Sequence, residues 1–147
     1  MNKILILPLL VTLFINGCGS NEKKCFYKIA NECVSKQEKE NFDLLTSKAY
    51  YKKATSSSDT SYHKWVFNEK QLAETTFDDD VEESYSKYSW GLEKKYVLIN
   101  LGEGLNKYAL KDLNKTAIEL YDLNHECTQT LYDNVEDALN DDSLSCI

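Results

Sequence analysis

Short apolar segments separated by turn residues fill the middle of the chain and restrict its fold. Seven segments between residues 49 and 122 are rich in β-branched and aromatic residues, and they begin about 10 to 12 residues apart. In some of them apolar and polar residues alternate, which is the pattern of a half-buried strand. The segments are 49–55, 62–68, 71–77, 83–90, 95–101, 107–110 and 116–122. They predict a mainly β fold, an antiparallel meander or a small barrel of about seven strands.

Two helices are expected to flank these strands. Apolar residues at helical spacing predict a short N-terminal helix across part of 34–45. Near the C-terminus, Leu131, Val135 and Ala138 would share one face of a helix over 128–140. Within the strand region, Gly91 predicts a break or a bulge.

The first residues have the features of an export signal. Lys3 precedes an apolar run at 4–15, which is too short for a membrane span of about 20 residues but fits a signal peptide. The run is followed by Ile15-Asn16-Gly17-Cys18, which resembles the lipobox of bacterial lipoproteins. Asn16 departs from the family pattern, where a small residue is more usual. The alternative is an ordinary secretory signal with a chance cysteine.

The lipoprotein resemblance implies how the N-terminus is processed. Residues 1–17 would be the signal peptide, and Cys18 would become the new N-terminus, carrying fatty acids such as palmitate. Two or three acyl chains give stable anchoring, where one chain is marginal. Residues 18–24 would form a lipidated tether to the membrane. In this family an Asp after the lipidated cysteine retains the protein at the inner membrane. Gly19 therefore implies the outer membrane, facing the periplasm.

The cysteine count fits this processing. The chain has five cysteines, and lipidation of Cys18 leaves an even set of four. Four cysteines in an exported chain predict two disulfides, for which three pairings are possible. The sequence favours the two local loops, Cys25–Cys33 and Cys127–Cys146, within a single disulfide-stapled β-rich domain over 25–147.

The order of these segments has a family resemblance. A strand with Tyr50 and Tyr51 precedes Lys64-Trp65-Val66-Phe67-Asn68-Glu69, and hairpin-like segments follow at 96–101 and 116–121. This order resembles small lipocalin-like lipoprotein domains over residues 42–122. The turn after Phe67 departs from that pattern, because Glu69-Lys70 replaces a glycine. The resemblance implies the order of helix, strand and hairpin, and it transfers no ligand.

Aromatic residues are the main candidates for a binding surface. They outnumber what one small core needs, and Tyr and Trp dominate binding hot spots. The residues proposed for binding are Trp65, Phe67, Tyr88 and Trp90. The alternative is that most of the aromatic residues form the core and cross-strand pairs.

The other polar patterns in the sequence give weaker indications of a functional site. The acidic run at 78–83 lacks the spacing of a calcium loop and is expected to connect two strands. His63 and His125 accompany no catalytic motif, so we expect no enzyme, metal or cofactor. Asn114 begins an Asn-x-Thr sequon, which is either a glycosylation acceptor or a polar hairpin turn.

The charge composition of the chain limits the classes of partner that it can bind. The chain has 17 Lys and no Arg against 24 Asp and Glu, so we expect no nucleic-acid partner. Residues 21–70 carry 10 Lys and 7 acidic residues, whereas 71–147 carry 6 Lys and 17 acidic residues. This asymmetry suggests that the Lys-rich part lies nearer an anionic membrane.

These features predict a membrane-anchored, non-catalytic binding module of the cell envelope, with a protein or a small apolar ligand as partner. Two alternatives remain open. One is a periplasmic immunity or inhibitor protein against a toxin or lytic enzyme, whose acidic half meets a basic partner. The other is a pilotin-like assembly factor of an envelope complex.

Overall fold

The computed structural model describes residues 25–30, 32–55, 59–102, 104–112, 114, 116–143 and 146. Cys18 and the predicted signal peptide lie outside these residues. A small hairpin comes first, of β1 (Tyr27–Ile29) and β2 (Glu32–Val34), followed by helix α1 (Lys36–Thr46). The main sheet consists of β3 (Ala49–Lys53), β4 (Tyr62–Phe67), β5 (Gln71–Asp78), β6 (Val81–Glu93), β7 (Tyr96–Asn100), β8 (Leu105–Asp112), β9 (Ala117–Asp122) and β10 (Cys127–Tyr132). Helix α2 (Val135–Leu139) ends the described fold.

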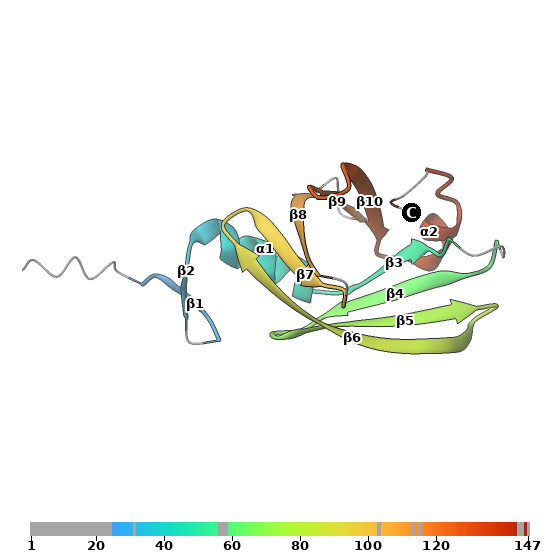
Figure 1. Cartoon of the computed structure of the whole chain (residues 1–147), viewed down its shortest axis with the longest axis horizontal. Coiled ribbons are helices and arrows are strands. Elements are labelled where there is room, and N and C mark those ends of the chain that lie inside the picture. Colours follow the sequence, from blue (N-terminus) through green and yellow to red (C-terminus); the bar gives the residue numbers. More distant parts are fainter. Residues whose placement is uncertain are drawn as a thin grey trace, which may run out of the picture.

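The prediction of a mainly β chain with antiparallel strands and a C-terminal helix is confirmed. Each strand from β3 to β10 pairs with the next one along the chain, and β10 also pairs with β3, so the eight strands form a closed barrel (Figure 1). The pairing of β10 with β9 extends over six residue pairs, whereas its pairing with β3 is the single pair Tyr132–Tyr51. We call this short junction the β3–β10 seam.

The C-terminal segment covers the seam. Helix α2 contacts β3, β4 and β10, and Ala138 on this helix is fully buried. Two ion pairs join the segment to the start and the end of β3: Lys48 Nζ lies 3.2 Å from Asp133 Oδ2, and Lys53 Nζ lies 3.5 Å from Asp142 Oδ1. The weakest strand pairing is thus supported from outside the barrel.

Helix α1 packs against one end of the barrel. Ser35 and Glu38 form a capping box at its N-terminus, which satisfies two backbone N–H groups there. Leu45 on the helix is fully buried, and the Tyr50 hydroxyl donates to the Leu44 carbonyl at 2.7 Å. At the turn between β6 and β7, the backbone N–H of Lys94 donates to Glu38 Oε1 at 2.8 Å. The helix therefore closes the end at which β6 turns into β7.

The interior follows the expected alternation of strand residues. Side chains that share the inner phase of their strands form one buried cluster, and Val66, between two inward residues of β4, is 37% exposed. The buried cluster comprises Leu45, Tyr50, Trp65, Phe67, Leu72, Val97, Ile99, Tyr108, Ile118, Leu120 and Leu131. Among the described residues, no helix is long and apolar enough to cross a membrane.

The predicted helix over 128–140 is wrong in its first half. Residues 128–132 belong to strand β10, in which Gln129 and Leu131 are buried and the intervening Thr130 is less so. Thr128 and Thr130 are β-branched and favour this extended conformation. The helix begins only after Asn134, whose side chain accepts a hydrogen bond from the Asp137 backbone N–H. β10 is the eighth strand of the barrel, where the sequence predicted about seven strands.

The break predicted at Gly91 is also wrong. Strand β6 runs through Gly91, which pairs with Leu98 of β7. A side chain at this position would meet no atom within 4 Å, so no close approach requires a glycine here. The register shift of the long hairpin lies instead between Thr76 and Phe77 of β5.

Both disulfides join the pairs that the sequence favours. Cys25 and Cys33 close the β1–β2 hairpin, with Cα atoms 5.4 Å apart. Cys127, at the start of β10, bonds to Cys146, with Cα atoms 5.3 Å apart. The second bond carries the chain that follows α2 back to the beginning of β10. The β1–β2 hairpin itself is not predicted by the sequence analysis.

Candidate functional site

One end of the barrel is open and contains a cavity. Because the strands alternate in direction, the loops that follow β3, β5, β7 and β9 lie together at the end opposite α1. The cavity there has a volume of about 550 Å³, within the range of small-molecule sites. It is lined by Lys52, Leu101, Gly104, Leu105, Asn106, Tyr108, Asp122, Asn124, His125, Gln129 and Cys146. We call this space the mouth cavity.

Lys52 is the most unusual group in the mouth cavity. It follows Tyr50 on the inner phase of β3, so a cationic side chain points toward the interior of the barrel. Its Nζ lies 4.7 Å from the centroid of the Trp65 ring and donates to Gln129 Oε1 at 3.4 Å. Burial lowers the pKa of Lys52, and the negative charge of Glu74 acts in the opposite direction.

A polar layer lies beside Lys52, on the inner faces of β4 and β5. Trp65 Nε1 donates to Glu74 Oε2, and His63 Nδ1 lies 3.0 Å from Thr76 Oγ1. Burial and the positive charge of Lys52 lower the pKa of His63, against an opposing effect of Glu74. The lowered pKa favours the neutral form of the His63 ring.

The rim of the mouth cavity is organised around Asp122. Its carboxylate, 3% exposed, accepts hydrogen bonds from the backbone N–H groups of Asn124 and His125, at 2.7 and 3.2 Å. The His125 Nδ1 lies 2.9 Å from the second oxygen of this carboxylate. Burial raises the pKa of Asp122, but hydrogen bonds from His125 and Asn124 outweigh it, so the net pKa is lowered. Asp122 thus holds the β9–β10 turn and the His125 ring in place.

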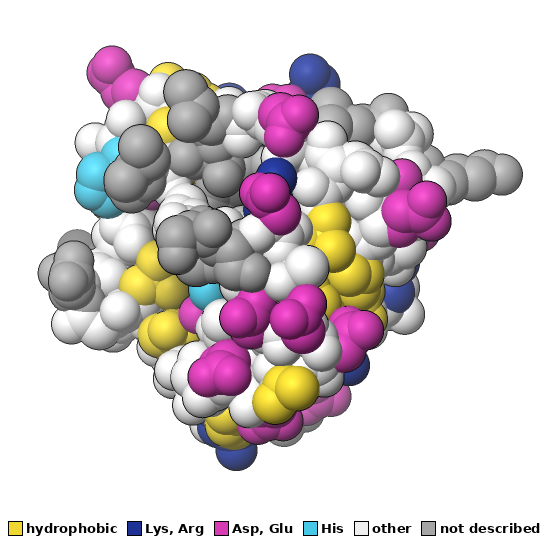
Figure 2. Space-filling view, turned by 90° about the vertical axis from the view of Figure 1, so that its right-hand side faces the viewer, with side chains coloured by type: hydrophobic (Ala, Val, Ile, Leu, Met, Phe, Trp, Pro, Cys, Tyr) yellow, Lys and Arg dark blue, Asp and Glu magenta, His cyan; other side chains and the backbone are white. Residues whose placement is uncertain are grey.

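Acidic side chains gather at the end of the molecule where β5 turns into β6, as Figure 2 shows. Asp79 and Asp80 form the two-residue turn itself, each with a positive φ, of 47° and 62°. Asp78 accepts from Thr60 and Ser61, and Asp80 accepts from the Tyr62 hydroxyl at 3.0 Å. The acidic run therefore connects two strands, as predicted. The described residues contain no group of three or more His, Cys, Asp or Glu side chains placed to hold a metal ion.

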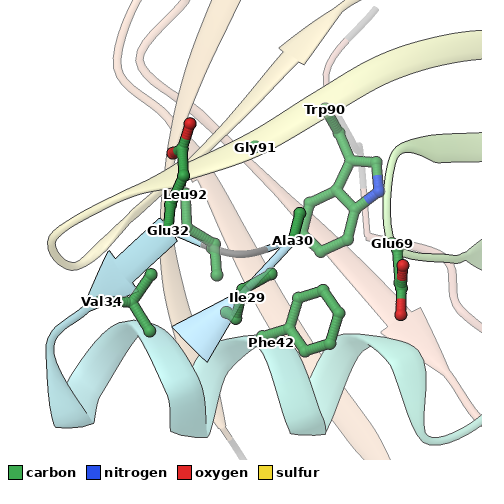
Figure 3. A pocket seen from close by; sticks show the side chains of 9 residues that line it. All are labelled: Ile29, Ala30, Glu32, Val34, Phe42, Glu69, Trp90, Gly91 and Leu92. Atoms are coloured by element: carbon green, nitrogen blue, oxygen red, sulfur yellow. The ribbon is translucent and has the colours of Figure 1, made fainter. Parts of the chain in front are cut away.

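A second hollow lies between the β1–β2 hairpin, α1 and β6 (Figure 3). Its volume is about 190 Å³, and Ile29, Val34, Phe42 and Leu92 give it an apolar surface. The Phe42 and Trp90 rings stack across it with centroids 5.9 Å apart. Its small volume makes it a weaker candidate for a ligand than the mouth cavity.

The predicted binding residues separate into two groups. Trp65 and Phe67 are 1% and 3% exposed, so they belong to the core and offer almost no surface to a partner. Tyr88 and Trp90 are partly buried and pack against that core, and Trp90 also lines the second hollow. None of the four lines the mouth cavity. The alternative, that most of the aromatic residues form core and cross-strand pairs, fits these four positions.

Lys52, Asp122 and Gln129 are functional candidates that the sequence analysis missed. Lys52 could have been found from the sequence, because it lies two residues after Tyr50 in a predicted strand and therefore faces the same side of the sheet. Gln129 carried no such signal, because its segment was assigned to a helix.

Asn114, the first residue of the sequon, organises a turn. Its Oδ1 accepts hydrogen bonds from the Thr116 backbone N–H at 2.7 Å and from the Ala117 N–H at 3.0 Å. This local bonding is the arrangement of an Asx turn before β9.

The chain matches no protein-family model, no curated protein and no solved structure.

Proposed function

We propose that this protein is a non-catalytic binding module of the bacterial cell envelope, held to the outer membrane by lipids on Cys18. The observation that carries the proposal is the mouth cavity of about 550 Å³, at the end of the barrel opposite α1. A small molecule entering this end would meet a mixed surface of leucines, amides and one lysine. The order of segments over residues 42–122, which resembles small lipocalin-like lipoprotein domains, fits a barrel of this kind.

The anchor rests on the lipobox-like sequence that ends at Cys18. Six residues lie between Cys18 and Cys25, the first residue of the described fold, so seven Cα–Cα steps join the two cysteines. A fully extended chain of that length spans roughly 25 Å. The barrel would therefore work close to the membrane surface, within reach of molecules that leave or enter the lipid layer.

An inhibitor or immunity protein is the second candidate. It is favoured by the acidic side chains at the end where β5 meets β6 (Figure 2). A basic enzyme or toxin would be steered toward this end by long-range attraction. In that case the partner would cover the mouth, and no small molecule would fill the cavity.

The test is native mass spectrometry of residues 19–147, exported behind a cleavable signal in the natural host and purified without detergent. We expect a bound small molecule at one per chain. In a matched variant, Leu101→Trp, we expect loss of that mass, because Leu101 is a partly buried residue of the cavity wall and the larger side chain would fill the cavity. An exposed outer position, Val81→Trp, is the control. A bare chain from the host that co-purifies with a basic protein would contradict the carrier function and support the inhibitor.

A further inference from the structure

We infer that the mouth cavity takes a small organic acid, a monoanion with an apolar body, and that Lys52 binds its acidic group. This inference rests on the proposed function and specifies the ligand class of the same site. It follows from the hydrogen-bonding capacity, the charge and the apolar surface of the cavity wall.

The free hydrogen-bonding capacity of the wall consists largely of donors. The Lys52 ammonium has three N–H groups, and its one hydrogen-bond acceptor among the described residues is Gln129 Oε1. Gln129 is 6% exposed, and the side-chain hydrogen bond that it forms among the described residues is the one its Oε1 accepts from Lys52. Asp122, the acidic group of the wall, already accepts from two backbone N–H groups and from His125. A ligand that fits this wall must therefore supply acceptors.

The charge of Lys52 is not neutralised by a contacting carboxylate. No ion pair within 4 Å joins Lys52 to an acidic residue of the described chain. The Glu74 carboxylate on the neighbouring inner face accepts from Trp65 Nε1 and lies 4.0 Å from His63 Nδ1. A cation removed from water gains most from a charged acceptor in direct contact, so the site favours an anion over a neutral acceptor.

The apolar residues of the cavity wall determine which kind of body the acidic ligand can have. Leu101 and Leu105 contribute apolar surface to the cavity that Lys52 and Gln129 also line. The acidic side chains at the nearby end of the molecule repel multiply charged anions more strongly than single charges (Figure 2). Polyphosphates and nucleic acids are therefore disfavoured, whereas an amphiphilic monoanion meets both the apolar and the cationic parts of the wall.

The probes are decanoate, decanol and decyltrimethylammonium, each titrated into residues 19–147 and followed by calorimetry and by amide NMR spectra. We expect decanoate to bind at least ten times more tightly than the two other probes. The side-chain amide signal of Gln129 should shift with decanoate. Inorganic phosphate is the fourth probe. If phosphate binds as tightly as decanoate, the site recognises anions that have no apolar part, and the inference is overturned.

The key variant is Lys52→Met, which keeps the length and apolar stem of the side chain. We expect it to weaken decanoate binding at least tenfold. The matched control is Lys111→Met on strand β8, at an exposed position, which should leave binding unchanged. If Lys52→Met fails to fold, Gln129→Leu removes the second donor and keeps the charge, and it should weaken decanoate binding while leaving decanol binding unaffected.

Failure of the inference is distinct from failure of the proposed function. Equal binding of decanoate and decanol, or an unchanged affinity in a folded Lys52→Met, would leave a carrier that binds through apolar surface alone. Tight binding of decyltrimethylammonium would assign the cavity to cations instead. If no probe binds and the host-purified protein carries no small molecule, both the inference and the carrier function are wrong.

Discussion

Individual polar residues determine how well the open end of the barrel is held together by hydrogen bonds. Asp122 is almost fully buried, yet three hydrogen-bond donors from the β9–β10 turn converge on its carboxylate. Lys52 shows the other situation, a cation on an inner strand face whose donors are only partly used. The pattern of alternating residues reveals which positions face inward, but it does not reveal which inward position tolerates a charge. That depends on neighbours such as Trp65 and Gln129, which lie far away in the sequence.

The contribution of Asp122 should depend on pH. Burial raises its pKa, but hydrogen bonds from His125 and Asn124 outweigh this, so the folded pKa lies below the unfolded one. The carboxylate therefore stabilises the fold above the unfolded pKa, and this contribution is lost as the pH falls through the folded pKa. We expect Asp122→Asn to lower the free energy of unfolding by about 1–3 kcal/mol at pH 7, and by less at pH 3, in urea titrations.

The control for this variant is Glu83→Gln, which changes an exposed carboxylate on β6. It should alter stability by no more than about 0.5 kcal/mol at either pH. An Asp122→Asn protein as stable as the wild type at pH 7 would show that the turn does not need the charge.

At the scale of the element, much of the sheet could be predicted from the sequence. The segments from 49 to 122 alternate as strands do, and turn residues separate them, so their number and direction followed from local pattern. Strand β10 was missed because Leu131 belongs to the strand, whereas Val135 and Ala138 belong to the helix that follows. Together the three mimic one helical face. Only the pairing of β10 with β9 and β3, a long-range contact, assigns residue 131 to the sheet. The candidate site was not predicted for the same reason, since its wall combines β3, β8, β9 and β10.

The two disulfides should contribute differently to stability. Cys127–Cys146 spans 19 residues and holds the segment that covers the β3–β10 seam. Its removal in Cys127→Ala/Cys146→Ala should lower the free energy of unfolding by about 3 kcal/mol, from loop-closure entropy. Cys25–Cys33 spans 8 residues within a hairpin outside the barrel. Its removal should leave the unfolding of the barrel within about 0.5 kcal/mol of the wild type.

Guanidinium titration followed by tryptophan fluorescence measures both variants, since Trp65 reports on the barrel core. The opposite order of effects, with the hairpin disulfide contributing more, would mean that the β1–β2 hairpin is an integral part of the cooperative unit.

At the scale of the whole molecule, charge divides the chain into two parts. Residues 21–70 are Lys-rich and include α1, whereas the strongly acidic residues 71–147 build most of the barrel from β5 onward. Figure 1 shows the β1–β2 hairpin and α1 toward one end of the molecule and the β5–β6 turn at the other. An anchor at Cys18 would join the chain at the hairpin end and leave the acidic end facing away from the lipid.

The anchor itself is testable in cells that are fed an alkyne analogue of palmitate. We expect the wild-type chain to incorporate the label and to fractionate with membranes, because the thiol of Cys18 is the proposed acceptor. Cys18→Ala should carry no label. The control is Cys25→Ala/Cys33→Ala, which removes two other thiols and should be labelled normally. A labelled Cys18→Ala chain would contradict lipidation at this cysteine.

If the chain is exported as proposed, closure of the barrel at the β3–β10 seam sets the order of folding events during export. The seam joins residues from opposite ends of the fold, and the ion pair beside it links Lys48 to Asp133, 85 residues later. Contacts at such sequence separation form slowly, because a long loop must close before they can. A chain that crosses a membrane from its N-terminus onward delivers β3 first and β10 last. During such export the earlier strands would form an open sheet with free edges, and the barrel could close only after β10 had crossed the membrane.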